Sequence, residues 1–347
     1  MDVKRRYDID WLRVIAIGLL LIYHIAIVFQ PWGVFIGFIQ SDQQWGSLWT
    51  PMMMFNVWRI PLLFFVSGMG VGFAMKKRNI KQLLAERSMR ILVPYLFGIL
   101  IIVPVHIFLW QKYYHQDLHY TIKQGHLWFL GNIFVYVLLL SPLFYFLRKH
   151  ENSKMARAIQ FLYKSPFSLL LVMLLFVVEV VLTKPELFEL YALSLHGFLL
   201  GFLAFFFGFS FILGATTFWP MVLKWRLVFL FLAVALYVVR IVEFQFKAPN
   251  CLTSIESNLW VFTVLGFAYR YLNRPGKALR YLSQAVYPVY IIHMIFLYGG
   301  SYIILPLNLS APTKFALLVL FTGAGCFLTY DLIIKRASFL RPLFGLK

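Results

Sequence analysis

The chain has 347 residues, of which 61% are apolar and only 13% are charged. An ordinary soluble domain is about 45–50% apolar and about 25% charged. One soluble core cannot bury this much hydrocarbon, so the composition excludes a soluble enzyme, a disordered chain and a disulfide-stapled secreted domain. The sequence indicates an integral membrane protein.

The formal charge is +19, from 32 Lys and Arg against 13 Asp and Glu. Such a balance suggests nucleic-acid binding in a soluble chain, but cytoplasmic loops of membrane proteins also accumulate Lys and Arg. The second explanation accounts for the charge, so no nucleic-acid partner is expected. The two cysteines, Cys251 and Cys326, lack CxxC or Cys/His spacing, and we expect no metal site.

Apolar runs predict about ten transmembrane helices, each needing roughly 20 residues. The expected spans lie near 11–30, 52–75, 91–111, 127–147, 167–183, 195–215, 227–244, 257–273, 284–304 and 314–333. The predicted fold is an all-α polytopic helix bundle that forms a single domain over 1–347. Most Lys and Arg residues fall in loops on the side of the two termini, so both termini are expected in the cytoplasm.

Polar groups at membrane depth cost several kcal/mol and are therefore functional candidates. His24 follows Arg13 by eleven residues in the first span, which places it about 16 Å deeper on the same helix face. Asp10 is spaced to pair with Arg13. His24 either hydrogen-bonds a neighbouring helix or acts as a general base.

The second span carries Arg59, Ser67 and Gly68 in RIPLLFFVSG. Arg59 either extends toward the membrane surface or holds an anionic or glycan group, and the glycine favours close helix packing. The following basic segment either binds anionic lipid or provides a phosphate site. Arg87 and Arg90 favour the phosphate, because their i,i+3 spacing brings two guanidiniums to one helix face.

Two later spans carry further polar groups. His126 and Trp128 begin the fourth span, where they form either an interfacial belt or the mouth of a sugar pocket. The ninth span carries a polar stripe that must face a cavity or another helix. Its residues, spaced by four, three and three, are Ser283, Tyr287, Tyr290 and His293.

Other ionisable residues have simpler expected roles. Glu179 is a carboxylate in the fifth span that either pairs with a buried His or Arg or is protonated. Arg240 and Glu243 are predicted to pair at i,i+3. His106 and His196 are weaker candidates, for packing or capping.

Five motifs occur in order between about residues 7 and 296: DWLRVIAIGLLLIYH, RIPLLFFVSG, RSMRILVPY, HLWFL and SQAVYPVYIIH. Together they resemble the membrane-bound acyltransferase family 3, which contains bacterial O-acyltransferases of glycans and lipid-linked sugars. The chain is most similar to stand-alone members without a fused extracytoplasmic domain, such as the periplasmic glucan succinyltransferase branch.

The resemblance implies a multi-pass enzyme of the bacterial inner membrane that modifies polysaccharide or lipid-linked sugar, for example by O-acetylation. An acetyl or succinyl group would pass from cytoplasmic acyl-CoA, a co-substrate, to a sugar hydroxyl, with no permanently bound cofactor. The oligomeric state, monomer or homodimer, stays open. The expected site residues are catalytic His24, Tyr290 and Ser67; acyl-CoA-binding Arg13, Arg87 and Arg90; and substrate-binding Arg59, His126, Trp128, Glu179, Ser283 and His293.

In the expected mechanism His24 deprotonates the acceptor hydroxyl, and Tyr290, Ser67 or Arg59 stabilises the oxyanion. A route through an acyl-histidine is an alternative. The rival function is a proton-coupled transporter or exporter of a small anion or a lipid-linked sugar. Consumption of a thioester distinguishes the two functions.

Overall fold

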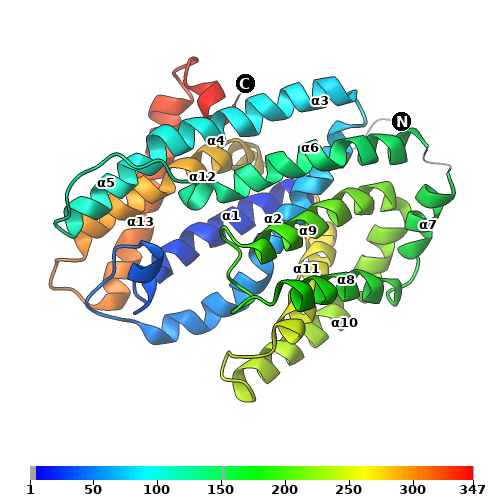
Figure 1. The fold of residues 1–347 in the computed structure, drawn as a ribbon, viewed down its shortest axis with the longest axis horizontal. Coiled ribbons are helices and arrows are strands. Elements are labelled where there is room, and N and C mark those ends of the chain that lie inside the picture. The colour runs from blue at the N-terminus through cyan, green and yellow to red at the C-terminus, as the bar shows by residue number, and fades with distance from the viewer. Residues whose placement is uncertain (1–4, 151–152, 347) are drawn as a thin grey trace. The chain divides into compact units, whose positions relative to one another are not determined.

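The computed structural model describes residues 5–150 and 153–346, and within these residues every regular element is a helix (Figure 1). The α-helices are α1 (Tyr7–Ile27), α2 (Trp49–Ala74), α3 (Ile80–Arg87), α4 (Val93–Phe97), α5 (Val103–Tyr113), α6 (Trp128–Lys149), α7 (Lys154–Leu162), α8 (Ser168–Thr183), α9 (Leu195–Leu213), α10 (Ala215–Val242), α11 (Asn250–Tyr271), α12 (Lys277–Ile304) and α13 (Ala311–Thr329). The prediction of an all-α polytopic bundle is confirmed.

Nine helical segments in the described residues are long and apolar enough to cross a membrane. They coincide with nine of the ten predicted spans. The remaining predicted span, near 167–183, coincides with α8. Because α8 has only 16 residues, it is about 24 Å long, shorter than a hydrocarbon core of about 30 Å. Helix α10 begins at Ala215, whereas the predicted span begins at 227. The prediction missed the first turns because Lys224 and Arg226 interrupt the apolar run there.

Helices α3, α4 and α5 follow one another through two π-helical segments, Ser88–Leu92 and Gly98–Ile102. A proline stands in the first turn after each segment, Pro94 in α4 and Pro104 in α5. Proline has no backbone N–H to donate to the preceding turn, so it breaks the regular α-helical hydrogen bonding. Wider π-helical turns are one way in which a helix accommodates such a break. The change of winding falls where the sequence predicts Arg87 and Arg90 to act.

The described chain divides into two compact units. The first contains 5–16, 54–86 and 132–279 apart from 151–152. In it α2 and α9 cross at two glycines: a side chain on Gly68 would collide with the Phe205 backbone, and one on Gly208 with the Phe65 backbone. The predicted packing role of Gly68 is thereby confirmed, since only glycine permits this approach.

The second unit contains 17–53, 87–131 and 280–346. Its apolar core joins α1, the segment after α1, α12 and α13 through buried side chains such as Phe29, Leu297 and Leu318. The Tyr298 hydroxyl on α12 donates to the carbonyl of Gly37 at 2.6 Å. Gly37 has φ +84°, a left-handed conformation that glycine adopts readily.

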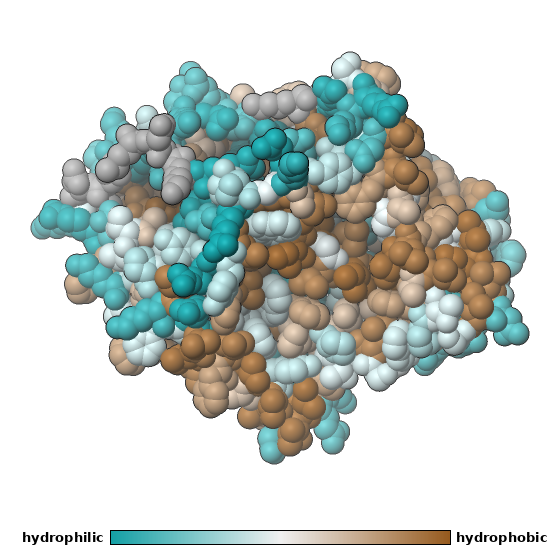
Figure 2. Space-filling view, turned by 180° about the vertical axis from the view of Figure 1, so that it is seen from behind, coloured by the Kyte–Doolittle hydropathy of each residue, from teal (hydrophilic) through white to brown (hydrophobic). Residues whose placement is uncertain are grey.

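Apolar side chains also cover much of the surface (Figure 2). Leu170 and Leu174 on α8, Phe231 on α10 and Leu320 on α13 are each more than half exposed. In a soluble protein, contiguous apolar surface of this extent is rare, whereas lipid chains provide a matching solvent. The surface therefore fits a helix bundle that spans a bilayer.

We expect Gly208→Ala to lower the free energy of unfolding by about 1–3 kcal/mol, because the new methyl group meets the α2 backbone and the helices must separate. The matched control is Gly18→Ala on α1, where an added Cβ meets nothing within 4 Å and improves helix propensity. Thermal unfolding of the detergent-solubilised variants, followed by tryptophan fluorescence, measures both. Equal melting temperatures for the two variants would contradict the close crossing.

Candidate functional site

Four histidines gather in the second unit, from α1, α5, α12 and the 3₁₀ turn Gly125–Leu127. Nδ1 of His24 lies 2.8 Å from Nε2 of His293. The ring centroids of His126 and His293 are 5.0 Å apart, and those of His106 and His126 are 5.6 Å apart. The structure thus brings His24, His126 and His293 together as one cluster and adds His106, a weaker candidate in the sequence.

Helix α12 anchors the cluster. His293 is fully buried, and its Nδ1 lies 2.6 Å from the carbonyl oxygen of Tyr290 one turn earlier. Nε2 of His126 lies 3.0 Å from the carbonyl oxygen of Ile291, and the Tyr290 hydroxyl donates to the carbonyl of His126 at 2.5 Å. These two bonds, in opposite directions, hold the Gly125–Leu127 turn against α12.

The polar stripe predicted on α12 divides into two parts. Tyr290 and His293 are buried in the cluster. Ser283 is partly exposed, and its hydroxyl makes a local 3.4 Å bond to the carbonyl of Arg280. Between these parts lies Tyr287, whose buried hydroxyl has no hydrogen-bond partner among the described residues. Only the C-terminal half of the stripe, Tyr290 and His293, therefore contributes to the cluster.

The two hydroxyls predicted to stabilise an oxyanion both donate to backbone carbonyls. The Tyr290 hydroxyl bonds His126, and the Ser67 hydroxyl bonds Leu63 at 2.7 Å within α2. Each would have to exchange this partner to reach a reacting oxygen. Trp128 is also buried, and its ring contacts Phe129, which in turn contacts Tyr290.

Arg87 ends α3 and Arg90 lies in the π-helical segment Ser88–Leu92, so the i,i+3 pair spans a change from α-helical to π-helical winding. The Arg87 guanidinium interacts electrostatically with Tyr287. The C-terminal turn also packs here: a side chain on Gly345 would meet the Tyr287 ring and the carbonyl of Arg90. Arg87 therefore lies near a phenol whose hydroxyl has no hydrogen-bond partner among the described residues, and the backbone of Arg90 borders the same C-terminal turn.

Arg13 and Arg59 belong to the first unit. Arg13 lies 3.9 Å from Asp10, which confirms the predicted pair. Arg59 is only 1% exposed and donates to the side chain of Asn56 at 2.9 Å. The alternative in which Arg59 extends toward the membrane surface is wrong, since its guanidinium is enclosed by protein.

Glu179 is buried and lies 3.0 Å from Nδ1 of His196, while Nε2 of His196 lies 2.9 Å from the carbonyl oxygen of Phe188. Thr183 also donates to the Glu179 carboxylate, at 3.1 Å. The expected pairing of Glu179 with a buried histidine is confirmed. These contacts link α8 to α9 within the first unit.

The predicted pair of Arg240 with Glu243 is wrong. Arg240 instead contacts Glu256 at 2.8 Å and Glu189 at 3.0 Å. A guanidinium 1% exposed needs partners that are buried with it, and Glu256 on α11 is fully buried. Burial raises the pKa of Glu189 from its ordinary value, and the Arg240 guanidinium opposes this shift.

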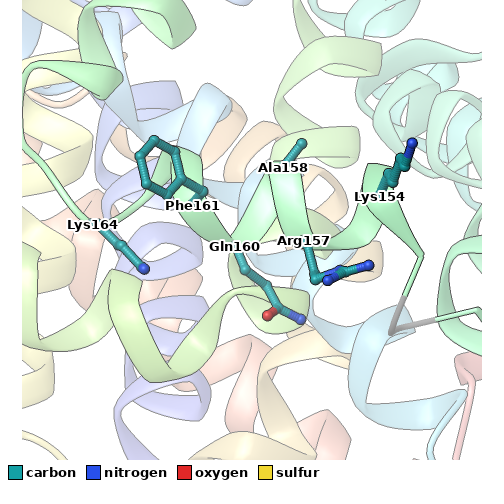
Figure 3. A pocket seen from close by; sticks show the side chains of 6 residues that line it. All are labelled: Lys154, Arg157, Ala158, Gln160, Phe161 and Lys164. Carbon is teal, nitrogen blue, oxygen red and sulfur yellow. The ribbon is translucent and has the colours of Figure 1, made fainter.

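A surface hollow of about 520 Å³ lies along α7 in the first unit, lined by Lys154, Arg157, Ala158, Gln160, Phe161 and Lys164 (Figure 3). None of the predicted site residues lines it. The Nζ of Lys164 lies 5.2 Å from the ring centroid of Phe161, which is exposed. Basic residues together with an exposed aromatic ring are typical of a helix at a membrane surface. No group of three or more His, Cys, Asp or Glu in the described residues is arranged to hold a metal ion.

A family model described as an acyltransferase domain, that of acyltransferase family 3, matches residues 6–331. No curated protein and no solved structure matches the chain. The family match covers nearly the whole chain and includes every residue of the histidine cluster. The chain belongs to acyltransferase family 3 and, with its long apolar helices, is a multi-pass membrane acyltransferase.

Proposed function

We propose that the protein transfers an acyl group, acetyl or succinyl, from cytoplasmic acyl-CoA to a hydroxyl of a cell-envelope glycan or lipid-linked sugar in a bacterial inner membrane. The observation that carries this proposal is the pairing of His24 with His293. His293 is completely buried, whereas His24 keeps part of its surface exposed. A histidine held by a second histidine, yet accessible, is suited to general base catalysis.

Arg87 and Arg90 are our proposed site for the phosphates of the donor. Guanidiniums bind phosphate through paired, charge-assisted hydrogen bonds. The neighbouring Tyr287 hydroxyl has no hydrogen-bond partner among the described residues, so it offers a further donor to an anionic oxygen. Arg13 belongs to the first unit, where it pairs with Asp10, and its role at the donor stays a prediction from the sequence.

The histidine cluster also offers a place for the acceptor. Nε2 of His126 must carry a proton, because it faces a carbonyl oxygen that can only accept. Its Nδ1 then carries the lone pair, and this buried atom has no hydrogen-bond partner among the described residues. A sugar hydroxyl would satisfy it, while the ring of Phe38, 5.6 Å from that of His24, supplies an apolar face.

In the proposed reaction His24 removes the proton of the acceptor hydroxyl as its oxygen attacks the thioester carbonyl. The C–O bond forms, negative charge builds on the carbonyl oxygen, and hydrogen-bond donors stabilise it. Collapse of this intermediate breaks the C–S bond, and the leaving sulfur takes the proton back from His24. The products are an ester and free CoA thiol, and His24 is regenerated.

Arg87→Ala/Arg90→Ala is expected to weaken acetyl-CoA or succinyl-CoA binding by roughly 10- to 100-fold or more, since each charge-assisted bond contributes about 1.5–3 kcal/mol. Labelled acyl-CoA binding to protein in nanodiscs measures this without knowledge of the acceptor. Lys81→Ala, which removes an exposed cation from α3, is the control. Equal binding by the double variant and the control would remove the donor site from these arginines.

His24→Ala is expected to bind acyl-CoA normally and to lose at least about 10²-fold in acyl transfer, the usual contribution of a general base. Release of CoA thiol in the presence of membrane glycans from the source cells measures transfer. Normal transfer by this variant would contradict the assignment of the base. A wild-type protein that binds no acyl-CoA and consumes no thioester would instead favour the transporter function.

A further inference from the structure

We infer that His293 is a positioning residue that fixes the tautomer of His24, placing the proton on Nδ1 and the basic lone pair on Nε2. The inference deepens the proposed function, because it assigns the atom that accepts the proton. It draws on two hydrogen-bond contacts within the second unit, Tyr290 with His293 and His293 with His24, and on the side chains packed around them.

The first step concerns His293. Its Nδ1 lies 2.6 Å from the carbonyl oxygen of Tyr290. A carbonyl oxygen has lone pairs and no proton, so Nδ1 must be the donor. In the neutral ring the other nitrogen then has no hydrogen. Nε2 of His293 is therefore an acceptor.

The second step concerns His24. Its Nδ1 lies 2.8 Å from Nε2 of His293, a normal hydrogen-bond distance. Because Nε2 of His293 can only accept, Nδ1 of His24 must donate. Neutral His24 then carries its lone pair on Nε2. Whatever this nitrogen contacts, it can only accept a hydrogen bond or a proton.

The surroundings hold this arrangement in place. His293 is 0% exposed, so water cannot replace Nε2 as the partner of His24. The two rings are nearly parallel, with 7° between their planes. His126 contacts His293 edge-on at 5.0 Å between centroids, a ring contact that leaves the bond to His24 undisturbed. The residues that meet here are 269 positions apart in the chain.

This proton order supports the reaction. When Nε2 of His24 takes the proton of the acceptor hydroxyl, His24 becomes an imidazolium with a proton on each nitrogen. The Nδ1 proton still points at the lone pair of His293, a charge-assisted bond stronger than the neutral one. The Nε2 proton then passes to the departing sulfur, and both rings return to their starting tautomers. His293 itself neither gains nor loses a proton.

The test compares two replacements of His293. The amide oxygen of His293→Gln reaches the place of Nε2 and accepts from His24, whereas His293→Phe keeps the ring volume and removes the acceptor. We expect His293→Phe to reduce kcat for acyl transfer by roughly 10²-fold with unchanged acyl-CoA binding, and His293→Gln to retain at least about ten times more activity than Phe. A packing role predicts the reverse order, because phenyl is the better apolar filler.

The tautomer is read directly by ¹⁵N NMR of histidine-labelled protein in nanodiscs, with the His24 signals assigned from His24→Ala. Wild type and His293→Gln should show protonated Nδ1 and unprotonated Nε2 at His24, and His293→Phe should shift His24 toward the other tautomer. The control is His106→Phe, a ring change in the same cluster that lies outside the three hydrogen-bonded groups.

Two results would overturn the inference: a proton on Nε2 of neutral His24 in the wild type, or an unchanged His24 spectrum in His293→Phe. Neither depends on substrate, so the tautomer can be judged even if no acyl transfer is found. Conversely, acyl transfer by His293→Phe at the wild-type rate would remove the positioning role and leave the acyltransferase function standing.

Discussion

Every polar group inside a bilayer must find its partner within the protein, and this constraint organises the polar interior of the chain. Arg240 is enclosed with Glu256 and Glu189, Glu179 with His196, and Arg59 with Asn56. Removing one member of a buried ion pair such as Arg240 and Glu256 is expected to cost about 3–5 kcal/mol, because the other charge loses a buried partner. Arg240 on α10 thereby joins Glu256 on α11, and Glu179 on α8 joins His196 on α9, whereas Arg59 and Asn56 lie on the same helix, α2.

The histidine cluster and its surroundings also contain hydrogen-bonding atoms that the protein leaves unused. Nδ1 of His126, Nδ1 of His106 and the hydroxyl of Tyr287 are buried without a partner among the described residues. Buried polar atoms without partners are uncommon in native proteins and call for an explanation. The proposed substrates would supply the missing bonds, the acceptor at the cluster itself and the donor beside Arg87.

Hydropathy alone predicted the ten helical segments, because a span of about 20 apolar residues is a strong signal. His24, His126 and His293 were also found from the sequence, since polar groups within such spans are costly. Their mutual contact was not predictable, as it joins α1 to α12. Sequence spacing gave the wrong partner where a residue distant in the chain is buried together with the charge. Arg240 pairs with Glu256 and not with the predicted Glu243. The π-helical segment around Arg90 likewise depends on packing as well as on Pro94.

For the proposed base, a histidine is a more suitable partner than a carboxylate in this buried cluster. An ionised carboxylate at position 293 would hold a negative charge among buried side chains throughout the resting state, and isolated buried charges cost several kcal/mol. The imidazole of His293 is neutral in its acceptor tautomer, so the resting pair carries no charge. In the proposed reaction, charge appears only when His24 takes the substrate proton, together with the negative oxygen that this transfer creates. The pair would therefore orient the proposed base at little electrostatic cost and leave the charge separation to the reaction itself.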